Sequence, residues 1–240
     1  MKKFLLERVR LSWYFVGFFV LYFCLLFVLP REKFVAGALA LFSVNSFLYG
    51  FYISPVLGAQ KARIEELHKI VRSEANAIFA MMLNTKDLPE HLRNGLQDDF
   101  KEYIQKTIRD RSGAGQKTYE ALIGFCLKYK GTNEADIDKL LDDLVANQQN
   151  RTDLNMQMNN RVFSNEWMIM FVLFLITLSF ILLLDTGPQL IYKIVTALLA
   201  TGLSMLIFSL VKLSTLTHKK AKQIWIPFEK LIDSHFYRID

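Results

Sequence analysis

Few side chains in this sequence could carry out catalysis, and their spacing does not group them into a site. The histidines are His68, His91, His218 and His235, and neither an HExxH nor a CxxC motif occurs. The acid pairs are Asp98-Asp99 and Asp142-Asp143. Adjacent residues of a helix point about 100° apart, so neither pair forms a carboxylate dyad. We therefore expect no catalytic residues, no bound metal and no cofactor, and we do not expect an enzyme.

One glycine-rich stretch, residues 113–118, resembles a phosphate-binding loop at first sight. That loop requires a glycine directly before its Lys-Ser/Thr pair, and Gln116 stands there instead. Arg111 occupies the place of the earlier glycine, and a helix rather than a strand is expected to precede it. We interpret the stretch as a turn between two helices.

Four apolar stretches dominate the chain. They cover residues 11–30, 34–55, 167–184 and 190–213. Each is close to the ~20 residues that a helix needs to cross ~30 Å of hydrocarbon. The polar residues 58–166 between the two pairs have helical periodicity and no strand-like alternation. The sequence thus predicts an all-α integral membrane protein, a four-helix (2+2) bundle with a helical cytoplasmic insert between the second and third spans.

This prediction divides the chain into four parts. They are an N-terminal transmembrane hairpin (1–57), a cytoplasmic helical domain (58–166), a C-terminal transmembrane hairpin (167–214) and an amphipathic cytoplasmic tail (215–240). Lys and Arg gather before the first span and after the second and fourth, and such an excess marks the cytoplasmic side. We expect a multi-pass protein with both termini in the cytoplasm. The tail is expected to pack on the insert, with docking at the lipid headgroups as the alternative.

The net charge of +6 is explained by the position of the basic residues. They lie near the ends of the spans, where they set the topology and attract anionic lipid. The lipid bilayer is therefore the expected partner, and nucleic acid is not. Cys24 lies in the first span and Cys126 in the insert, so the two cysteines imply no disulfide.

The apolar run of the second span is interrupted by the polar residues Ser43, Asn45 and Ser46. Asn45 lies near mid-membrane, where its amide must face another helix or water. Phe47 and Phe51 are four residues apart and share a face, which Ser43 extends by one turn. A ring of such faces would form an apolar constriction, whereas ordinary helix packing explains the same pattern without a pore. No Asp, Glu, Arg or His lies inside any span, which disfavours pumps and ion-coupled carriers.

Residues 46–52, SFLYGFY, resemble the second membrane helix of bestrophin anion channels. The continuation through EANAI (74–78), Leu88-Pro89 and Tyr103 is similar to a bacterial bestrophin-like membrane family of unknown function. The resemblance implies a passive channel for inorganic ions, with anions as the bestrophin substrate. It also implies a homo-oligomer in the bacterial inner (plasma) membrane, a pentamer if it follows bestrophins.

The candidate residues follow from this resemblance and from the pattern of the second span. The candidate pore-lining residues are Ser43, Asn45, Ser46, Phe47, Gly50 and Phe51. Glu74 and Asn76 are candidates for coupling the span to the insert, although a solvated or capping carboxylate explains Glu74 more simply. No acidic run follows the fourth span, so the resemblance does not extend to a calcium clasp.

A second hypothesis fits the same four spans. The protein could be a non-conducting membrane scaffold or sensor, whose insert binds a cytoplasmic partner while the spans only anchor it. The oligomeric state separates the two hypotheses. A closed ring of four or more subunits favours the channel, whereas a monomer or dimer favours the scaffold.

Overall fold

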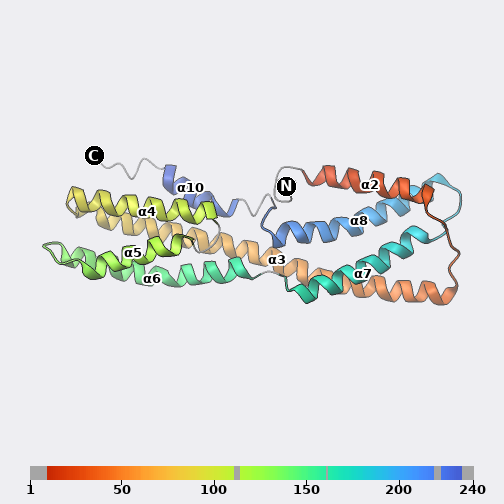
Figure 1. The fold of residues 1–240 in the computed structure, drawn as a ribbon, viewed down its shortest axis with the longest axis horizontal. Coiled ribbons are helices and arrows are strands. Elements are labelled where there is room, and N and C mark those ends of the chain that lie inside the picture. Colours follow the sequence, from red (N-terminus) through yellow and green to blue (C-terminus); the bar gives the residue numbers. More distant parts are fainter. Residues whose placement is uncertain (1–9, 111–113, 161, 219–222, 234–240) are drawn as a thin grey trace. The chain divides into compact units, whose positions relative to one another are not determined.

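The computed structural model describes residues 10–110, 114–160, 162–218 and 223–233, and the regular elements in those ranges are all helices (Figure 1). The prediction of an all-α protein is confirmed. The chain forms two compact units. The apolar unit comprises Met1–Ala62 and Arg161–Ala221, and the polar unit comprises Arg63–Asn160 and Lys222–Asp240.

The apolar unit contains the predicted spans. Its helices are α2 (Leu11–Val28), the first part of α3 (Ala36–Asn84), α7 (Ser164–Leu183) and α8 (Leu190–Ser214). Four helical stretches among the described residues are long and apolar enough to cross a membrane. Three of the predicted spans differ from the observed helices by only a few residues at their ends.

Helix α3 is the main departure from the sequence prediction. We expected the second span to end near Pro55 and a new helix to follow, but α3 is one helix of 49 residues with Pro55 inside it. Proline lacks an N–H and therefore removes the hydrogen bond to the carbonyl of Phe51, four residues earlier. Tyr49, Ile53, Val56 and Leu57 on both sides pack in one apolar cluster with α7 and α8, so the loss of this one bond does not end the helix.

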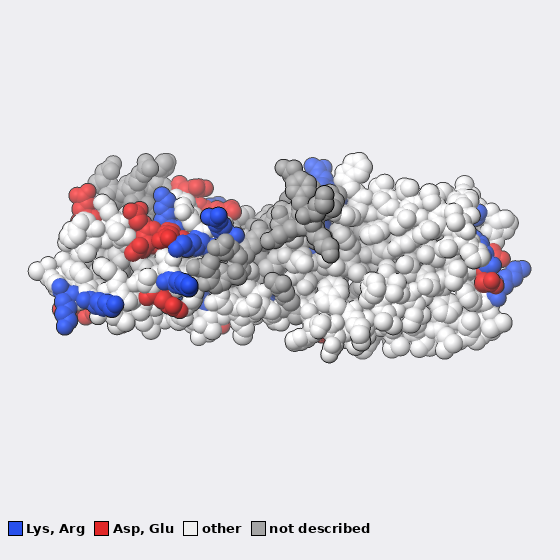
Figure 2. All heavy atoms as spheres, in the orientation of Figure 1, with Lys and Arg blue, Asp and Glu red and all other residues white. Residues whose placement is uncertain are grey.

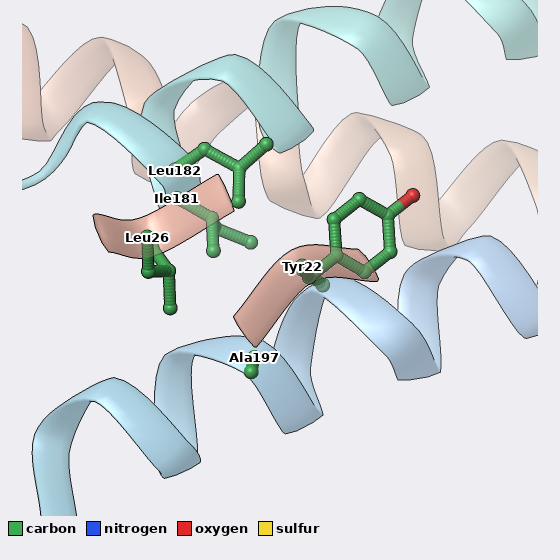
Figure 3. Packing of buried hydrophobic residues seen from close by; sticks show 6 residues of the cluster. Tyr22, Leu26, Ile181, Leu182 and Ala197 are labelled. Atoms are coloured by element: carbon green, nitrogen blue, oxygen red, sulfur yellow. The ribbon is translucent and has the colours of Figure 1, made fainter. Parts of the chain in front are cut away.

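Three spans meet in a cluster of buried apolar side chains (Figure 3). Its members are Tyr22 and Leu26 of α2, Ile181 and Leu182 of α7, and Ala197 and Ala200 of α8. The two alanines leave room for α2 to approach α8 closely, as small residues do between membrane helices. The hydroxyls of Tyr22 and Ser204, 2.5 Å apart, add a buried hydrogen bond between the same two helices.

The two hairpin loops of the apolar unit are hydrogen-bonded to each other. The backbone N–H of Glu32 donates to the carbonyl of Leu183 (2.8 Å), and that of Asp185 donates to the carbonyl of Glu32 (3.0 Å). Gly187 has a φ of 85°, a conformation that glycine adopts without strain. Its N–H donates to the Asp185 carboxylate at 3.0 Å. The α2–α3 and α7–α8 hairpins are thereby fixed at the same end of the unit.

The polar unit consists of shorter helices around the second part of α3. They are η1 (Thr85–Asp87), α4 (Glu90–Asp110), α5 (Ala114–Lys128), α6 (Glu134–Asn159), η2 (Gln223–Trp225) and α10 (Ile226–Asp233). On the face drawn in Figure 2, charged side chains are scattered over this unit, whereas the apolar unit shows them only near its ends.

The prediction of a turn over residues 113–118 is wrong for residues 114–118, which are helical. Helix α5 begins at Ala114, so Gly115 is helical. A Cβ atom on Gly115 would overlap the Thr107 hydroxyl and the ring of Tyr103. The glycine therefore serves close packing of α5 against α4 and does not form a turn.

Two further contacts hold the polar unit together. The guanidinium of Arg63 donates to the carbonyls of Gln157 (2.6 Å, from Nε) and Met158 (2.9 Å, from Nη2), which lie at the end of α6 and lack partners within that helix. Helix α10 packs against α4 and buries Trp225, Phe228 and Leu231 with η2. The tail residues Phe236 and Tyr237 lie outside the described residues, as do the basic residues Lys2, Lys3, Arg8, Lys219, Lys220 and Lys222.

Candidate functional site

In the apolar unit, helix α3 has one buried face and one exposed face. Tyr49 and Ile53 are buried in a cluster with α7 and α8. Phe47 and Phe51 lie on the opposite side, 69% and 70% exposed, and their rings stack with centroids 6.0 Å apart. This separation follows from the helical period, because residues two apart lie about 200° apart around the axis.

Ser43 and Gly50 share the exposed face with the two phenylalanines. The Ser43 hydroxyl donates to the carbonyl of Leu39 in its own helix (3.0 Å). Gly50 is exposed, and no atom lies within 4 Å of the place where a Cβ would stand. We call Ser43, Phe47, Gly50 and Phe51 the aromatic face of α3. It holds four of the six candidate pore-lining residues.

The other two candidates, Asn45 and Ser46, lie toward the bundle. The Asn45 amide donates to the carbonyl of Leu173 (3.1 Å) and to the hydroxyl of Thr177 (2.7 Å), both in α7. A polar group among apolar helices requires such partners. The Ser46 hydroxyl oxygen is buried and has no hydrogen-bond partner among the described residues. Asn45 thus joins α3 to α7 within one chain.

In the polar unit, Glu74 is fully buried among four helices. The Tyr103 hydroxyl donates to its Oε1 atom, and Arg151 Nη1 lies 3.5 Å from the same oxygen. Arg151 is 4% exposed, and its guanidinium lies over both the Tyr103 and the Tyr119 ring, 4.6 and 4.3 Å from centroids that are themselves 5.3 Å apart. We call these four residues, one each from α3, α4, α5 and α6, the Glu74 cluster. Because Arg151 is buried, its cation–π contacts with the two tyrosines are stronger than such contacts are at an exposed site.

Polar neighbours complete only part of this cluster. Arg151 Nη2 donates to Gln116 Oε1 at 2.7 Å. The Tyr119 hydroxyl donates to the carbonyl of Leu144 at 2.7 Å and accepts from the Asn147 amide at 3.1 Å. Glu74 Oε2 and Arg151 Nε, however, are buried without a hydrogen-bond partner among the described residues. A buried ion pair whose hydrogen bonds are incomplete destabilises the fold if either partner is removed. The charges of Glu74 and Arg151 therefore depend strongly on each other.

Burial shifts the proton equilibria of the cluster. It raises the pKa of the Glu74 carboxyl above its ordinary value of 4.5, against the opposing effects of the Tyr103 hydroxyl and the Arg151 charge. Burial, reinforced by the Glu74 charge, also raises the pKa of Tyr103 well above 10.0. The pKa of Tyr119 rises to about 12, mainly through burial. Both tyrosines therefore stay protonated near neutral pH, and Glu74 is the group of the cluster whose charge changes most readily.

Asn76 lies away from the Glu74 cluster. It is exposed and lines a cavity together with His68 and Arg72, which are on the same face of α3. The two candidate coupling residues therefore have different surroundings. Within the ranges that the structure describes, no group of three or more His, Cys, Asp or Glu side chains could hold a metal ion.

Sequence reasoning missed Arg151, although its position in α6 gives a signal. The buried residues of this helix include Leu140, Leu144, Asn147, Arg151 and Leu154, spaced by three and four. Arg151 is thus a cation within a buried helical stripe, where a charge needs a partner. Such a residue predicts a buried acid elsewhere in the chain, and Glu74 is that acid.

A family model described as a bestrophin-like domain matches residues 14–216. The chain belongs to the bestrophin-like family. In this bestrophin-like chain the matched region contains the aromatic face of α3 and the Glu74 cluster. The family and the four apolar helices identify a membrane protein. The search of curated proteins and that of solved structures each find no match.

Proposed function

We propose that this protein is an oligomeric, passive ion channel whose pore is lined by the aromatic face of α3. The family is the bestrophin type, which favours a channel over an enzyme. The four apolar helices cross the bacterial inner membrane as two hairpins, with both termini and residues 58–166 in the cytoplasm. Copies of the chain surround one axis, and inorganic ions, anions by resemblance, pass along it.

The observation that carries this proposal is the exposure of Phe47 and Phe51. These rings stand on the side of α3 that faces away from α7 and α8. A ring of phenylalanines forms an apolar constriction that gates by dewetting. Ser43 and Gly50 on the same face are small, so neighbouring copies of α3 can approach closely there.

The placement of Asn45 refines the candidate pore. Its amide donates hydrogen bonds to α7. We therefore propose that Asn45 fixes α3 against α7 within its own subunit and does not contact ions. Ser46 lies toward the same side. The pore lining that we propose is therefore Ser43, Phe47, Gly50 and Phe51.

Glu74 has a supporting part in this proposal. Helix α3 is continuous from the aromatic face to Glu74, so a change at the carboxylate acts on the same helix. The Glu74 cluster fixes α3 to three other helices of the polar unit. We propose that this cluster anchors α3, and that its release alters the pore.

Reconstitution of the full chain tests the proposal. The protein is placed in vesicles of phosphatidylethanolamine and phosphatidylglycerol, its native mass is measured, and chloride and potassium fluxes are followed after a voltage is imposed. A closed ring of at least four subunits with passive flux supports the channel. A monomer or dimer without flux supports the non-conducting scaffold instead.

A further inference from the structure

The polar unit contains a cavity of about 720 Å³ between α3 and the η2–α10 segment. This volume falls within the range of sites for small organic ligands, roughly 300–1,000 Å³. One stripe of α3 lines it, from His68 to Phe79, and one stripe of η2–α10, from Gln223 to Leu231. The lining positions recur every three or four residues, with Ala75-Asn76, Ile226-Pro227 and Lys230-Leu231 as adjacent pairs, so each stripe is a single helix face.

The polar part of the lining is cationic. Arg72 of α3 and Lys230 of α10 carry the charge, and His68 of α3 adds an imidazole. Among the described residues that line the cavity there is no Asp or Glu, although residues 63–160 hold more acids than bases. The side chains of Asn76 and Gln223 add amide groups. Such a lining favours an anion.

A second, smaller cavity extends this polar part. It measures about 350 Å³ and is lined by His68, Lys69, Arg72, Ser73 and Asn76. Lys69 has Glu66 3.4 Å away, but both side chains are largely in solvent, where such a pair is weak. Together the two cavities offer more donor groups than the two oxygens of a carboxylate can use. A phosphate, with three or more oxygens, matches them better.

The remaining lining is apolar. Phe79 of α3 and Ile226, Pro227 and Leu231 of α10 supply carbon surface to the larger cavity. An inorganic ion would leave this surface in contact with water. A ligand with an apolar body would cover it, and each buried methylene group contributes about 0.8 kcal/mol.

We propose that this cavity binds an amphipathic organic phosphate, with the phosphate near Arg72 and Lys230 and the apolar body against Phe79 and Ile226. The ligand would connect α3 to α10. This site does not depend on whether the protein conducts ions.

Calorimetric titration of the full chain in phosphatidylcholine nanodiscs tests the proposal. The probes are 1-naphthyl phosphate, inorganic phosphate and 1-naphthol. We expect naphthyl phosphate to bind at least about tenfold more tightly than either of the other two, because each of those lacks one part of the ligand. Equal affinity for naphthyl phosphate and inorganic phosphate, or no binding of naphthyl phosphate, would overturn it.

Substitutions locate the site. Arg72→Gln and Lys230→Gln each remove an exposed charge, and each should weaken naphthyl phosphate binding about tenfold. The matched control is Lys101→Gln, an exposed lysine on α4 that does not line either cavity. Ile226→Ser should weaken naphthyl phosphate but not inorganic phosphate. Equal losses in Lys101→Gln and Arg72→Gln would contradict a specific site.

A final arm separates two sources of such a ligand. Nanodiscs that contain phosphatidic acid are titrated with 1-naphthyl phosphate. If naphthyl phosphate no longer binds in these nanodiscs, at high salt as well as at low salt and in Lys101→Gln as well as in the parent chain, the site has a membrane lipid as its ligand. Unchanged binding supports the site with a soluble organic phosphate as its ligand.

Discussion

Arg151 Nη1 lies 3.5 Å from Glu74 Oε1 in the interior of the polar unit, while Glu74 Oε2 has no hydrogen-bond partner among the described residues. Both side chains are almost completely removed from solvent. Neither charge has water to replace its partner, so each is stable there mainly because of the other. The pair comes from α3 and α6, and its integrity therefore determines how α3 is held in this unit.

Removal of Arg151 should destabilise the polar unit. Arg151→Met leaves the Glu74 carboxylate buried without its cation, at a cost of about 3–5 kcal/mol near neutral pH. Chemical denaturation of the full chain in detergent measures the change. The control is Arg109→Met, because Arg109 is exposed at the end of α4, and it should leave the free energy of unfolding nearly unchanged. Equal stability of the two variants would mean that the pair is not essential.

Stability should depend on the protonation of Glu74. Burial raises the pKa of this carboxyl in the folded chain, so the folded state holds the proton more tightly than the unfolded state does. The contribution of Glu74 is therefore most favourable below about pH 4.5 and is lost as pH rises through the raised pKa. Glu74→Gln, which has no proton to lose, should flatten this part of the pH profile. The exposed Glu90→Gln should not, and a profile unchanged by Glu74→Gln would contradict the assignment.

Gly115 should resist substitution by alanine. A Cβ atom there meets Tyr103 and Thr107, so Gly115→Ala should lower the free energy of unfolding by about 1–3 kcal/mol. Gly124 lies in the same helix with open space around it. Gly124→Ala should leave stability unchanged or raise it by up to about 1 kcal/mol, because alanine favours a helix. Thermal unfolding of both variants measures the difference. A Gly115→Ala variant as stable as Gly124→Ala would contradict the close packing of α4 and α5.

Asn45 should stabilise the apolar unit. Asn45→Leu removes two hydrogen bonds to α7, and bonds between membrane helices contribute about 0.6–2 kcal/mol. Ser43→Ala is the control, because that hydroxyl bonds only within its own helix. Unfolding in mixed micelles measures both variants. The account fails for Asn45 if its substitution is as well tolerated as that of Ser43.

The sequence predicts most of the helices, since apolar stretches of about 20 residues define the spans without any tertiary information. It did not reveal the continuity of α3, because a proline stops a helix in most contexts and only the flanking turns decide the outcome at Pro55. The helical period separates Phe47 and Phe51 from Tyr49, but it does not say which face is covered. That depends on how α7 and α8 pack.

The Glu74 cluster shows a different limit. The sequence suggested that Glu74 mattered, but its main partner lies 77 residues away along the chain, from position 74 to position 151. Local periodicity cannot connect such distant positions. It marks Arg151 as a cation in a buried stripe, and the pairing becomes visible only when α3 and α6 are packed together. Asn76 likewise lines a cavity that α3 forms with α10, which is about 150 residues away along the chain.

The proposed pore is tested most directly by single-channel recording in planar bilayers. The full chain is compared with Phe51→Ala, which shortens an exposed ring on the aromatic face of α3, and with Phe171→Ala, which shortens a 51% exposed ring on α7. We predict that the parent chain gives passive currents, that Phe51→Ala raises the open probability or conductance several-fold by weakening the apolar constriction, and that Phe171→Ala behaves like the parent. Silence of all three proteins, or equal currents from all three, would contradict a pore lined by this face.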